Sequence, residues 1–473
     1  MHTLRVLTTL LVIGLLSAPL AIQADPGSLT PDLIEKYRKQ TDDNALIRPI
    51  VNAATNNDIK SLSLNRDIIA GHDSQFNFEL EGSKIIDQKI SGRCWMFAGA
   101  NVATPEIMAR LKLKDFKLSE AYLAFWDKLE KSNLFLETMI RMRDRDIEDR
   151  ALQMYLESPV GDGGWWQYFQ GLIGKYGLVT AAAMPETEQS TKTARSNGLL
   201  NMLLRKATAE IRRLAAEGKK EKAIREYKES VLGEVYSLLV CTYGRPPQTF
   251  TLRYEEEVDD STKHLVEQQF TPLEFYNTYY APALPRFVAI SDNPNRPYGK
   301  LYKMESSRNM FEEPDIEVVN LPIEKLKKYA YESILDSQIV WFACDVTHDE
   351  YRDSGILAVD VYDYGTTFGI DFKYSKADRL AYKDLTTNHA MALVGLDTTA
   401  SGQPRRWKVE NSWGADKGNG GYWSMYDDWF DQYVLLVMVD ETRLEPDDAA
   451  ILRQKPVIIK DWEPFYRDLR TIQ

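Results

Sequence analysis

Three well-separated segments of the chain carry a thiol, an imidazole and an amide, the residue types of a nucleophilic cysteine site. Cys94 lies in the segment Gln-Lys-Ile-Ser-Gly-Arg-Cys-Trp-Met-Phe-Ala, His389 follows 295 residues later, and Asn411 opens an Asn-Ser-Trp-Gly sequence. A thiolate can attack a carbonyl carbon once a histidine accepts its proton, and an amide oxygen can hold the histidine ring in place. The order Cys, His, Asn therefore predicts hydrolysis by a cysteine nucleophile.

Neighbouring residues fit the same chemistry. A helix is expected to begin at Cys94, and its positive end together with a His389 imidazolium should lower the thiol pKa from its usual value of about 8.5. Gln88 lies six residues before Cys94, so its side-chain NH₂ and the Cys94 backbone N–H could both donate to a tetrahedral oxyanion. Trp413 is expected to cover the hydrogen bond between His389 and Asn411 from water.

Each of these residues has a second interpretation when it is taken alone. A buried Cys94 could be structural, His389 could be a core histidine of an apolar strand, and Asn411 could belong to a turn. Their joint order, with Gln88 at the right offset, favours the catalytic interpretation. His348, near acidic residues, is interpreted as an exposed polar turn rather than a metal ligand.

The chain has three cysteines, too few and of the wrong parity for the disulfide framework of a small secreted domain. Cys241 and Cys344 lie in apolar sequences, and both are predicted to be small buried residues without a reactive role. The net charge of −12 disfavours nucleic acid and anionic membranes as partners. At 473 residues and 44% apolar content, the chain can bury a sizeable core.

The first residues are typical of a secretory signal. A weakly positive start that ends at Arg5 is followed by a largely apolar run from Val6 to Ile22, and Ala24 offers a cleavage site. An uncleaved membrane anchor is the alternative, although the apolar run is short for a membrane span. We therefore expect export to the periplasm or the extracellular space, with no membrane association after cleavage.

The remaining pattern predicts helices first and strands second. Thr30 is an expected N-cap with Pro31 at the first helical position, and a helix should open after Asp162-Gly-Gly-Trp-Trp and end near Gly177. Residues 198–240 read as helical with a break at Gly218. Beyond about residue 245 the pattern becomes β, at 249–254, 286–290, 337–343, 390–395 and 406–411. This order indicates an α+β fold with a cleft between two halves.

These motifs resemble the bleomycin hydrolase and aminopeptidase C family, the long-insert branch of the papain superfamily. The segment around Cys94 and the Asn-Ser-Trp-Gly sequence mark the superfamily, whereas the long Cys–His spacing and further motifs mark the branch. Those further motifs are Leu29-Thr-Pro-Asp-Leu-Ile-Glu-Lys-Tyr-Arg, Asn57-Asp-Ile near Leu64-Asn-Arg, Asp162-Gly-Gly-Trp-Trp, Ser291-Asp-Asn-Pro, Pro297-Tyr-Gly-Lys-Leu-Tyr, Trp341-Phe-Ala-Cys-Asp-Val and Asn388-His-Ala-Met.

The resemblance implies Cys94 as nucleophile, His389 as base, Asn411 as the residue that orients it and Gln88 as oxyanion donor, with no cofactor and no metal. It implies peptide substrates and a homohexamer whose active sites face a central chamber. It also implies aminopeptidase action, because the C-terminal arm lies in the cleft and the carboxylate of Gln473 would receive the substrate α-amine.

The expected architecture is a papain-like two-lobed fold with a helical lobe, a β-barrel-like sheet lobe and a large helical insertion. The expected segments are a signal peptide at 1–24, an N-terminal arm at 25–80, the helical lobe at 81–185, the insertion at 186–245, the β-rich lobe carrying His389 and Asn411 at 246–460, and a C-terminal arm at 461–473.

Two features differ from the family pattern. Its members are usually cytosolic, whereas this chain carries an export signal. The tail from Trp462 to Gln473 is longer than the family's short, small-residue ending, so it could overshoot the carboxylate position, be trimmed, or leave the cleft open.

Three functions therefore stay open. The leading hypothesis is a cysteine-type aminopeptidase. The second is an endopeptidase or acyl-transferring variant with an open cleft, which activity on N-blocked peptides would favour. The third is a non-catalytic binding or assembly protein of the same fold, which the complete set of Gln88, Cys94, His389 and Asn411 argues against.

Overall fold

The computed structural model describes residues 25–82, 84–259, 262–461 and 463. Two compact units divide the chain. The first consists of the described residues up to Ser63 together with Gly365–Gly369, and the second comprises Leu64–Tyr364 and the described residues from Ile370 onward. The predicted signal peptide and Gln473 lie outside the described residues, and the predicted segment boundaries stay predictions.

The first unit is built from short helices with few buried residues. Its helices are α1 (Pro31–Asp42), α2 (Ile47–Ala54) and α3 (Ile59–Ser63), and its other segment, Gly365–Gly369, includes most of α14 (Tyr364–Phe368). The Thr30 hydroxyl accepts the Leu33 N–H and Pro31 is the first helical residue, which confirms the predicted helix start. Neither α1 nor α2 contains a buried residue.

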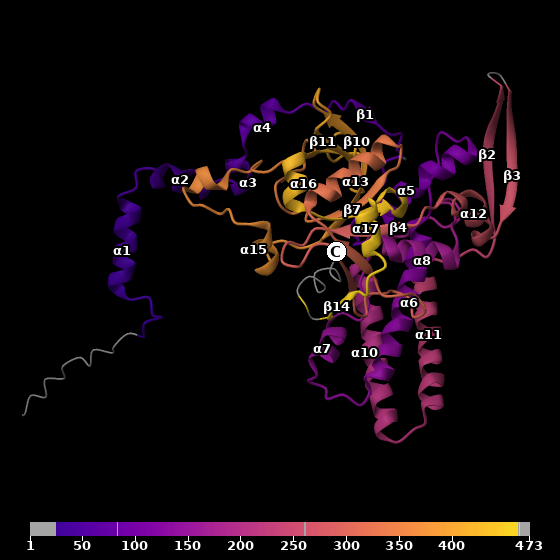
Figure 1. Cartoon of the computed structure of the whole chain (residues 1–473). Coiled ribbons are helices and arrows are strands. Elements are labelled where there is room, and N and C mark those ends of the chain that lie inside the picture. Colours follow the sequence, from indigo (N-terminus) through magenta and orange to yellow (C-terminus); the bar gives the residue numbers. More distant parts are fainter. Residues whose placement is uncertain (1–24, 83, 260–261, 462, 464–473) are drawn as a thin grey trace, which may run out of the picture. The chain divides into compact units, whose positions relative to one another are not determined.

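The second unit begins with a helical part (Figure 1). Its helices are α4 (Arg66–Gly71), α5 (Cys94–Leu111), α6 (Glu120–Arg141), α7 (Arg150–Glu157), α8 (Trp166–Tyr176), α9 (Glu188–Thr191), α10 (Ala194–Ala216), α11 (Glu221–Tyr243) and α12 (Pro272–Tyr279). The predicted end of α8 is confirmed, because Gly177 caps it, and Gly218 separates α10 from α11 as expected. Helices α10 and α11 lie side by side and pack on α6.

The sheet part follows. Among the described residues, twelve strands form one sheet, in which β1 (Phe78–Glu79) pairs with β10 and the other strands run in the order β14, β5, β6, β4, β13, β7, β10, β11, β12, β9, β8. Their bounds are β4 (Phe287–Ser291), β5 (Lys300–Met304), β6 (Glu317–Asn320), β7 (Val340–Cys344), β8 (Glu350–Tyr351), β9 (Ile356–Leu357), β10 (His389–Thr398), β11 (Pro404–Glu410), β12 (Tyr422–Tyr426), β13 (Val434–Asp440) and β14 (Val457–Ile459). Helices α13 (Ile323–Leu335), α15 (Lys376–Ala381), α16 (Asp427–Tyr433) and α17 (Pro446–Ile451) accompany it.

Strand β10 lies at the centre of the sheet and shows why this sequence forms a two-layered core. Its residues Ala390, Ala392 and Val394 point into a core shared with the helical part, whereas Met391 and Leu393 point into a second core. Successive strand residues face opposite sides of a sheet, so alternating small and large apolar residues fill both layers. The small alanines allow α5 to pack closely on β10.

A separate two-stranded hairpin, β2 (Phe250–Asp259) and β3 (Thr262–Phe270), extends beside α12 (Figure 1). Its base is anchored in the first core by Phe250 and Phe270, which contact Phe275 of α12. The α+β prediction, with a helical part first and a sheet part second, is confirmed.

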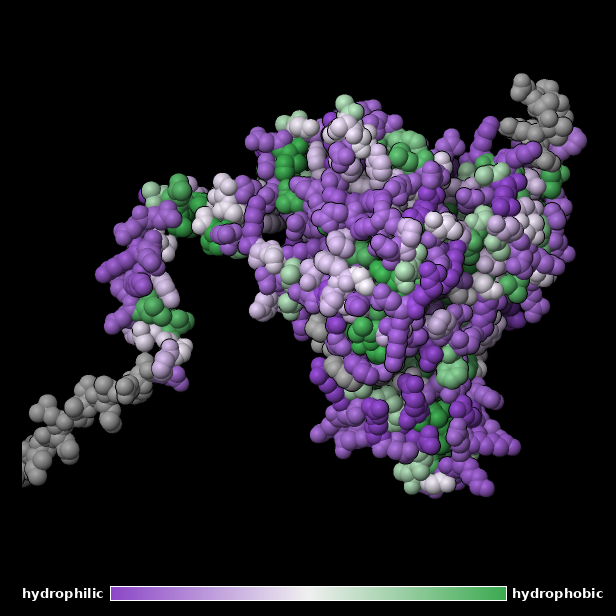
Figure 2. Space-filling model, in the orientation of Figure 1, coloured by the Kyte–Doolittle hydropathy of each residue, from purple (hydrophilic) through white to green (hydrophobic). Residues whose placement is uncertain are grey.

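The surface carries mainly hydrophilic residues on the face shown in Figure 2, with hydrophobic residues in small separate groups. Of the helices in the described ranges, none combines the length and the apolar character that a bilayer crossing requires.

Candidate active site

The thiol of Cys94 lies at the first residue of α5, where Arg93 is the N-cap. Cys94 is fully buried. Its sulfur is hydrogen-bonded by the backbone of Ala390, the residue after His389, and by the backbone of Trp95. The Trp95 carbonyl also accepts the Trp341 indole N–H at 3.1 Å, which ties the start of α5 to strand β7. The fold therefore brings the nucleophile segment against the strand that begins with His389.

The expected lowering of the Cys94 pKa is wrong for this structure. Burial raises the pKa of the thiol to about 12, and the backbone hydrogen bonds from Ala390 and Trp95 offset only part of that effect. A thiolate loses its hydration when it is enclosed, and here this cost outweighs the backbone hydrogen bonds to the sulfur. The resting thiol is therefore protonated at neutral pH.

Two donors converge on the side-chain oxygen of Asn411. The His389 Nε2 atom lies 2.8 Å from Asn411 Oδ1, and the Ser412 backbone N–H donates to the same oxygen at 2.7 Å. An amide oxygen only accepts, so the second bond fixes the amide orientation and the first requires the ring proton on Nε2. In the neutral ring, Nδ1 is then left with its lone pair and can serve as a base.

The pairing of β10 with β11 positions these two residues. The register places Ala392 opposite Glu410, so His389 and Asn411 lie near the same end of an antiparallel ladder. Both side chains are buried. The geometry of the His389–Asn411 bond is thus fixed within the sheet, whereas Cys94 comes from the helical part.

An aromatic ring and a cation lie next to the imidazole. Trp413 stacks on His389 with ring centroids 4.8 Å apart and an interplanar angle of 30°. The guanidinium carbon of Arg352 lies 4.8 Å from the Trp413 ring centroid. Burial lowers the pKa of His389 to about 4, the Asn411 bond opposes that effect, and the Arg352 charge adds to it. The base is therefore neutral at pH 7.

The amide of Gln88 is held between the two parts of the second unit. Its Oε1 accepts the Ser412 hydroxyl at 2.6 Å, and its backbone N–H donates to the Ser412 carbonyl at 2.8 Å. Its Nε2 donates to the Ser91 carbonyl at 2.6 Å. An amide nitrogen carries two protons, so one remains for a substrate oxyanion.

The sequence did not reveal the partners that hold this arrangement. Ser412 bridges Asn411 and Gln88, and its only sequence signal is its place inside Asn-Ser-Trp-Gly. Arg352 lies in a loop with no motif, so nothing pointed to it. Asp162 hydrogen-bonds the nucleophile segment, and the Gly-rich turn that it opens was the available signal.

Other predicted residues have mixed outcomes. Cys344 is buried as predicted, but Cys241 is exposed. Leu239 and Tyr243 of α11 face the core, and Cys241 lies on the opposite side of the helix. His348 is half-buried rather than exposed, because its ring stacks on Tyr433 with centroids 5.5 Å apart. Within the described ranges, no group of three or more histidine, cysteine or acidic residues could hold a metal ion.

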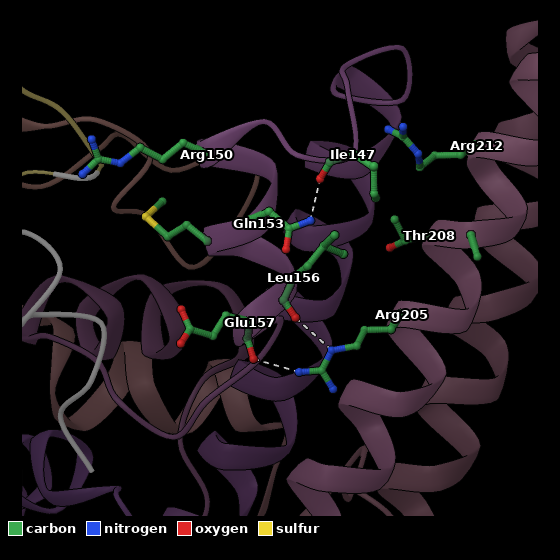
Figure 3. A pocket seen from close by; sticks show the side chains of 10 residues that line it. Ile147, Arg150, Gln153, Leu156, Glu157, Arg205, Thr208 and Arg212 are labelled. Carbon is green, nitrogen blue, oxygen red and sulfur yellow. Dashed lines mark hydrogen bonds between the residues drawn. The ribbon is translucent and has the colours of Figure 1, made fainter. Parts of the chain in front are cut away.

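A cavity of about 670 Å³ opens between α7 and α10 (Figure 3). Gln88, Cys94, His389 and Asn411 are absent from its described lining residues. Arg205 in its wall donates to the Leu156 and Glu157 carbonyls at 2.8 Å each. The Arg205 side chain thus joins α7 to the insertion, and its guanidinium is already hydrogen-bonded to backbone carbonyls.

Comparison with known proteins gives matches over most of the chain. The Peptidase C1-like family matches residues 28–466. Aminopeptidase C of Streptococcus thermophilus is 35% identical over 440 residues, covering 93% of this chain and 98% of that protein. Aminopeptidase G of Lactobacillus delbrueckii subsp. lactis is 37% identical over 417 residues, covering 88% and 94%.

A solved structure extends the likeness to three dimensions. PepW from Lactobacillus rhamnosis HN001 superposes with a TM-score of 0.88 at 34% identity, covering 93% of this chain and 99% of that one. The expected papain-like fold with a helical insertion and the resemblance to the aminopeptidase C branch are confirmed. The chain belongs to the Peptidase C1-like family, and it is a cysteine-type peptidase.

Proposed function

We propose that the chain is an aminopeptidase that releases N-terminal residues from peptides, with Cys94 as nucleophile and His389 as general base. The observation that carries the proposal is the pair of donors on Asn411 Oδ1, because it leaves His389 Nδ1 as a base where α5 meets β10. Relatives named Aminopeptidase C and Aminopeptidase G support the exopeptidase part.

In the first half-reaction, the Cys94 sulfur attacks the scissile carbonyl carbon while His389 Nδ1 takes the thiol proton. The oxyanion accepts hydrogen bonds from the Cys94 backbone N–H and from the second proton of Gln88 Nε2. His389 then gives its proton to the leaving amine nitrogen, the C–N bond breaks and a thioester remains on Cys94. Water deprotonated by His389 hydrolyses that thioester and releases the N-terminal residue.

The resting pair is uncharged in this scheme. Burial keeps the Cys94 thiol protonated and the His389 ring neutral because it raises the pKa of the first group and lowers the pKa of the second. Proton transfer therefore accompanies attack, and the imidazolium exists only while the oxyanion does. The Asn411 bond then becomes charge-assisted and stronger than in the resting state.

The test uses one peptide with a free and with an acetylated N-terminus. Mature protein, Cys94→Ala and the control Cys241→Ala, which changes an exposed thiol of α11, are each incubated with both peptides, and products are followed by mass spectrometry. We expect stepwise loss of N-terminal residues from the free peptide only, with mature protein and with Cys241→Ala.

Other outcomes are equally informative. Internal cuts in both peptides would establish an endopeptidase with an open cleft. Products that persist in Cys94→Ala, or no products from any protein, would reject Cys94 catalysis and favour a binding or assembly role. The place of Gln473 in the cleft stays a prediction, which removal of the last residue tests through the Michaelis constant for free peptides.

We also propose that the protein is a homohexamer. The apolar residues Leu46, Val51 and Ile59 of the first unit are exposed, and α1 and α2 bury none of their own residues, so another copy could cover them. Light scattering should give a hexamer for the mature chain and smaller species for a Leu46→Lys, Val51→Lys double variant. The control Leu335→Lys, an exposed residue on α13, should leave the mass unchanged, and a monomeric mature chain would reject the proposal.

Export remains part of the proposal as well. The apolar run of residues 6–22 and the Ala24 site support a cleaved signal. Terminal sequencing of protein recovered outside the cytoplasm should begin at Asp25. Recovery of the full-length chain from the cytoplasm alone would reject export.

A further inference from the structure

The carboxylate of Asp162 holds the backbone just before the nucleophile. Its Oδ2 accepts the Gly92 N–H at 2.9 Å, and its own carbonyl accepts the Trp95 indole N–H at 2.8 Å. These two partners lie on either side of Cys94 in the sequence. Asp162 is therefore attached to both flanks of the residue whose N–H would meet the oxyanion.

The same carboxylate is tied to the beginning of the helical insertion. Its Oδ2 also accepts the Thr193 hydroxyl at 2.5 Å, and its Oδ1 accepts Asn197 Nδ2 at 2.8 Å. Thr193 is the N-cap of α10, yet its hydroxyl makes no capping bond to the helix. Lys128 of α6 completes the set with Nζ 2.5 Å from Oδ1 and a side chain that is 1% exposed. Both oxygens of Asp162 are thus fully used.

Two more contacts join the nucleophile segment, residues 88–93, to the insertion junction, which we define as Glu186–Asn197. The Ile90 N–H donates to the Thr191 carbonyl at 3.0 Å. The buried Arg93 guanidinium forms a bidentate pair with Glu186 at 2.8 and 2.9 Å. A bidentate pair fixes direction as well as distance. The insertion junction therefore contacts the nucleophile segment at residues 90 and 93 directly, and at Gly92 through Asp162.

The nucleophile segment adopts a conformation that it would not hold alone. Lys89 has a φ of 55°, in the left-handed region that non-glycine residues rarely occupy. Such a conformation persists only where the surroundings determine it, and it is common at functional sites. Ser412 holds one end of the segment through Gln88, and the insertion junction with Asp162 holds the other.

We propose that Asp162 is a positioning residue through which the insertion junction sets the direction of the Cys94 backbone N–H toward the substrate oxyanion. The insertion then has a role in the reaction itself. This inference rests on the proposed function, because the oxyanion belongs to that reaction. Asp162 does not touch substrate, and it acts through Gly92.

Asp162→Asn separates positioning from thiol ionisation. The Asp162 charge raises the pKa of Cys94, and its removal also leaves the buried Lys128 cation without its partner. Both changes favour the thiolate. The variant should therefore have a more readily ionised thiol and yet a slower reaction, a combination that simple loss of structure does not produce.

The experiment measures kcat and KM on an alanyl anilide, together with the pH dependence of Cys94 alkylation by iodoacetamide, read from the Cys94 peptide by mass spectrometry. Asp162→Asn and Thr193→Val are compared with wild type. The matched control is Asp448→Asn, whose buried carboxylate on α17 pairs with Lys325 of α13 at 2.9 Å. All rates are corrected for the folded fraction.

We expect kcat of Asp162→Asn to fall roughly tenfold to a hundredfold, since an oxyanion donor is misdirected rather than removed. Its alkylation inflection should move to lower pH. Thr193→Val should lose about threefold to tenfold in kcat, the equivalent of one hydrogen bond, with no such movement. Asp448→Asn should stay within about threefold of wild type, because the ion pair it breaks, with Lys325, includes neither Asp162 nor a residue of the nucleophile segment.

An Asp162→Asn protein with kcat within twofold of wild type would overturn the inference. Equal losses in Asp162→Asn and Asp448→Asn with an unmoved alkylation inflection would do the same. If Asp162→Asn does not fold, wild-type kcat in Thr193→Val overturns it. Absence of Cys94-dependent turnover in wild type would instead reject the proposed function, and the alkylation inflection would still decide whether Asp162 acts on Cys94.

Discussion

Asn411 offers the sharpest test of how this site works. Its side-chain oxygen accepts one hydrogen bond that affects catalysis, from His389, and one that affects only stability, from Ser412. In Asn411→Ala, the His389 Nε2–H and the Ser412 N–H both lose an acceptor in a buried site. The loss at Ser412 is the same throughout the reaction and should lower the free energy of unfolding by about 1–3 kcal/mol. The loss at His389 differs between the resting state and the transition state, because the bond to Asn411 stabilises the imidazolium more than it stabilises the neutral ring.

The kinetic magnitude follows from that difference. A hydrogen bond to a charged group contributes about 1.5–3 kcal/mol, which corresponds to a roughly tenfold to 150-fold fall in kcat/KM. Asn411→Asp gives a different expectation. The acceptor of both donors is kept, and Asn411 Nδ2 has no hydrogen-bond partner among the described residues, so no bond is lost. The added anion should raise the pKa of His389 and move the acid limb of the pH profile upward.

The assay compares kcat/KM of both variants and wild type on a fluorogenic aminoacyl amide from pH 4 to 9. Active sites are counted by alkylation of Cys94, and unfolding by urea is followed by tryptophan fluorescence. We expect Asn411→Asp to retain more kcat/KM than Asn411→Ala at pH 8. The reasoning would be refuted if kcat/KM of Asn411→Ala stayed within about threefold of wild type. It would also be refuted if kcat/KM of Asn411→Asp were lower than that of Asn411→Ala and its acid limb had not moved.

Three further predictions follow from the same structure. Gln88→Ala should lower kcat by about 10²–10³-fold with little change in KM, because the second proton of Gln88 Nε2 donates only to the oxyanion. A change confined to KM in steady-state assays would contradict this. Arg352→Gln should raise the pKa of His389, since the guanidinium charge lowers it, so the acid limb of kcat/KM should move to higher pH and an unmoved limb would count against the role. Burial raises the pKa of Glu120 from 4.5 to about 7, so its contribution to stability is complete below pH 4.5 and is lost as pH rises through 7, up to about 3 kcal/mol. Glu120→Gln should thus be more stable than wild type against urea at pH 8 but not at pH 4, and an equal difference at both would exclude this cause.

Local elements were predictable because their signals are local. Thr30 and Pro31 mark a helix start, Gly177 and Gly218 mark helix ends, and apolar runs mark strands such as β7 and β10. The order of strands in the sheet was not predictable, because neighbouring strands come from distant parts of the chain. Strand β13, for example, pairs with β4 and β7, and no residue in these strands specifies its partner by type.

The site divides in the same way. Cys94, His389, Asn411 and Gln88 could be proposed from the sequence because their types and order carry chemistry. The ionisation of the thiol was predicted wrongly, since the extent of burial is a tertiary property. Asp162 and Arg352 were missed for a related reason. Asp162 reaches Gly92 across 70 residues of sequence, and such contacts leave no periodic pattern.

The placement of the reacting groups in two different cores has a consequence for how this peptidase matures. Cys94 belongs to the core of the helical part, whereas Trp407 and Val409 of β11, the strand that leads to Asn411, lie in the second core. A chain whose sheet has formed but has not yet received α5 contains a complete base and no nucleophile beside it. Hydrolysis therefore requires α5 to be docked on the sheet, and a chain in which this contact is open has no assembled site. In mild denaturant, activity should disappear before secondary structure does.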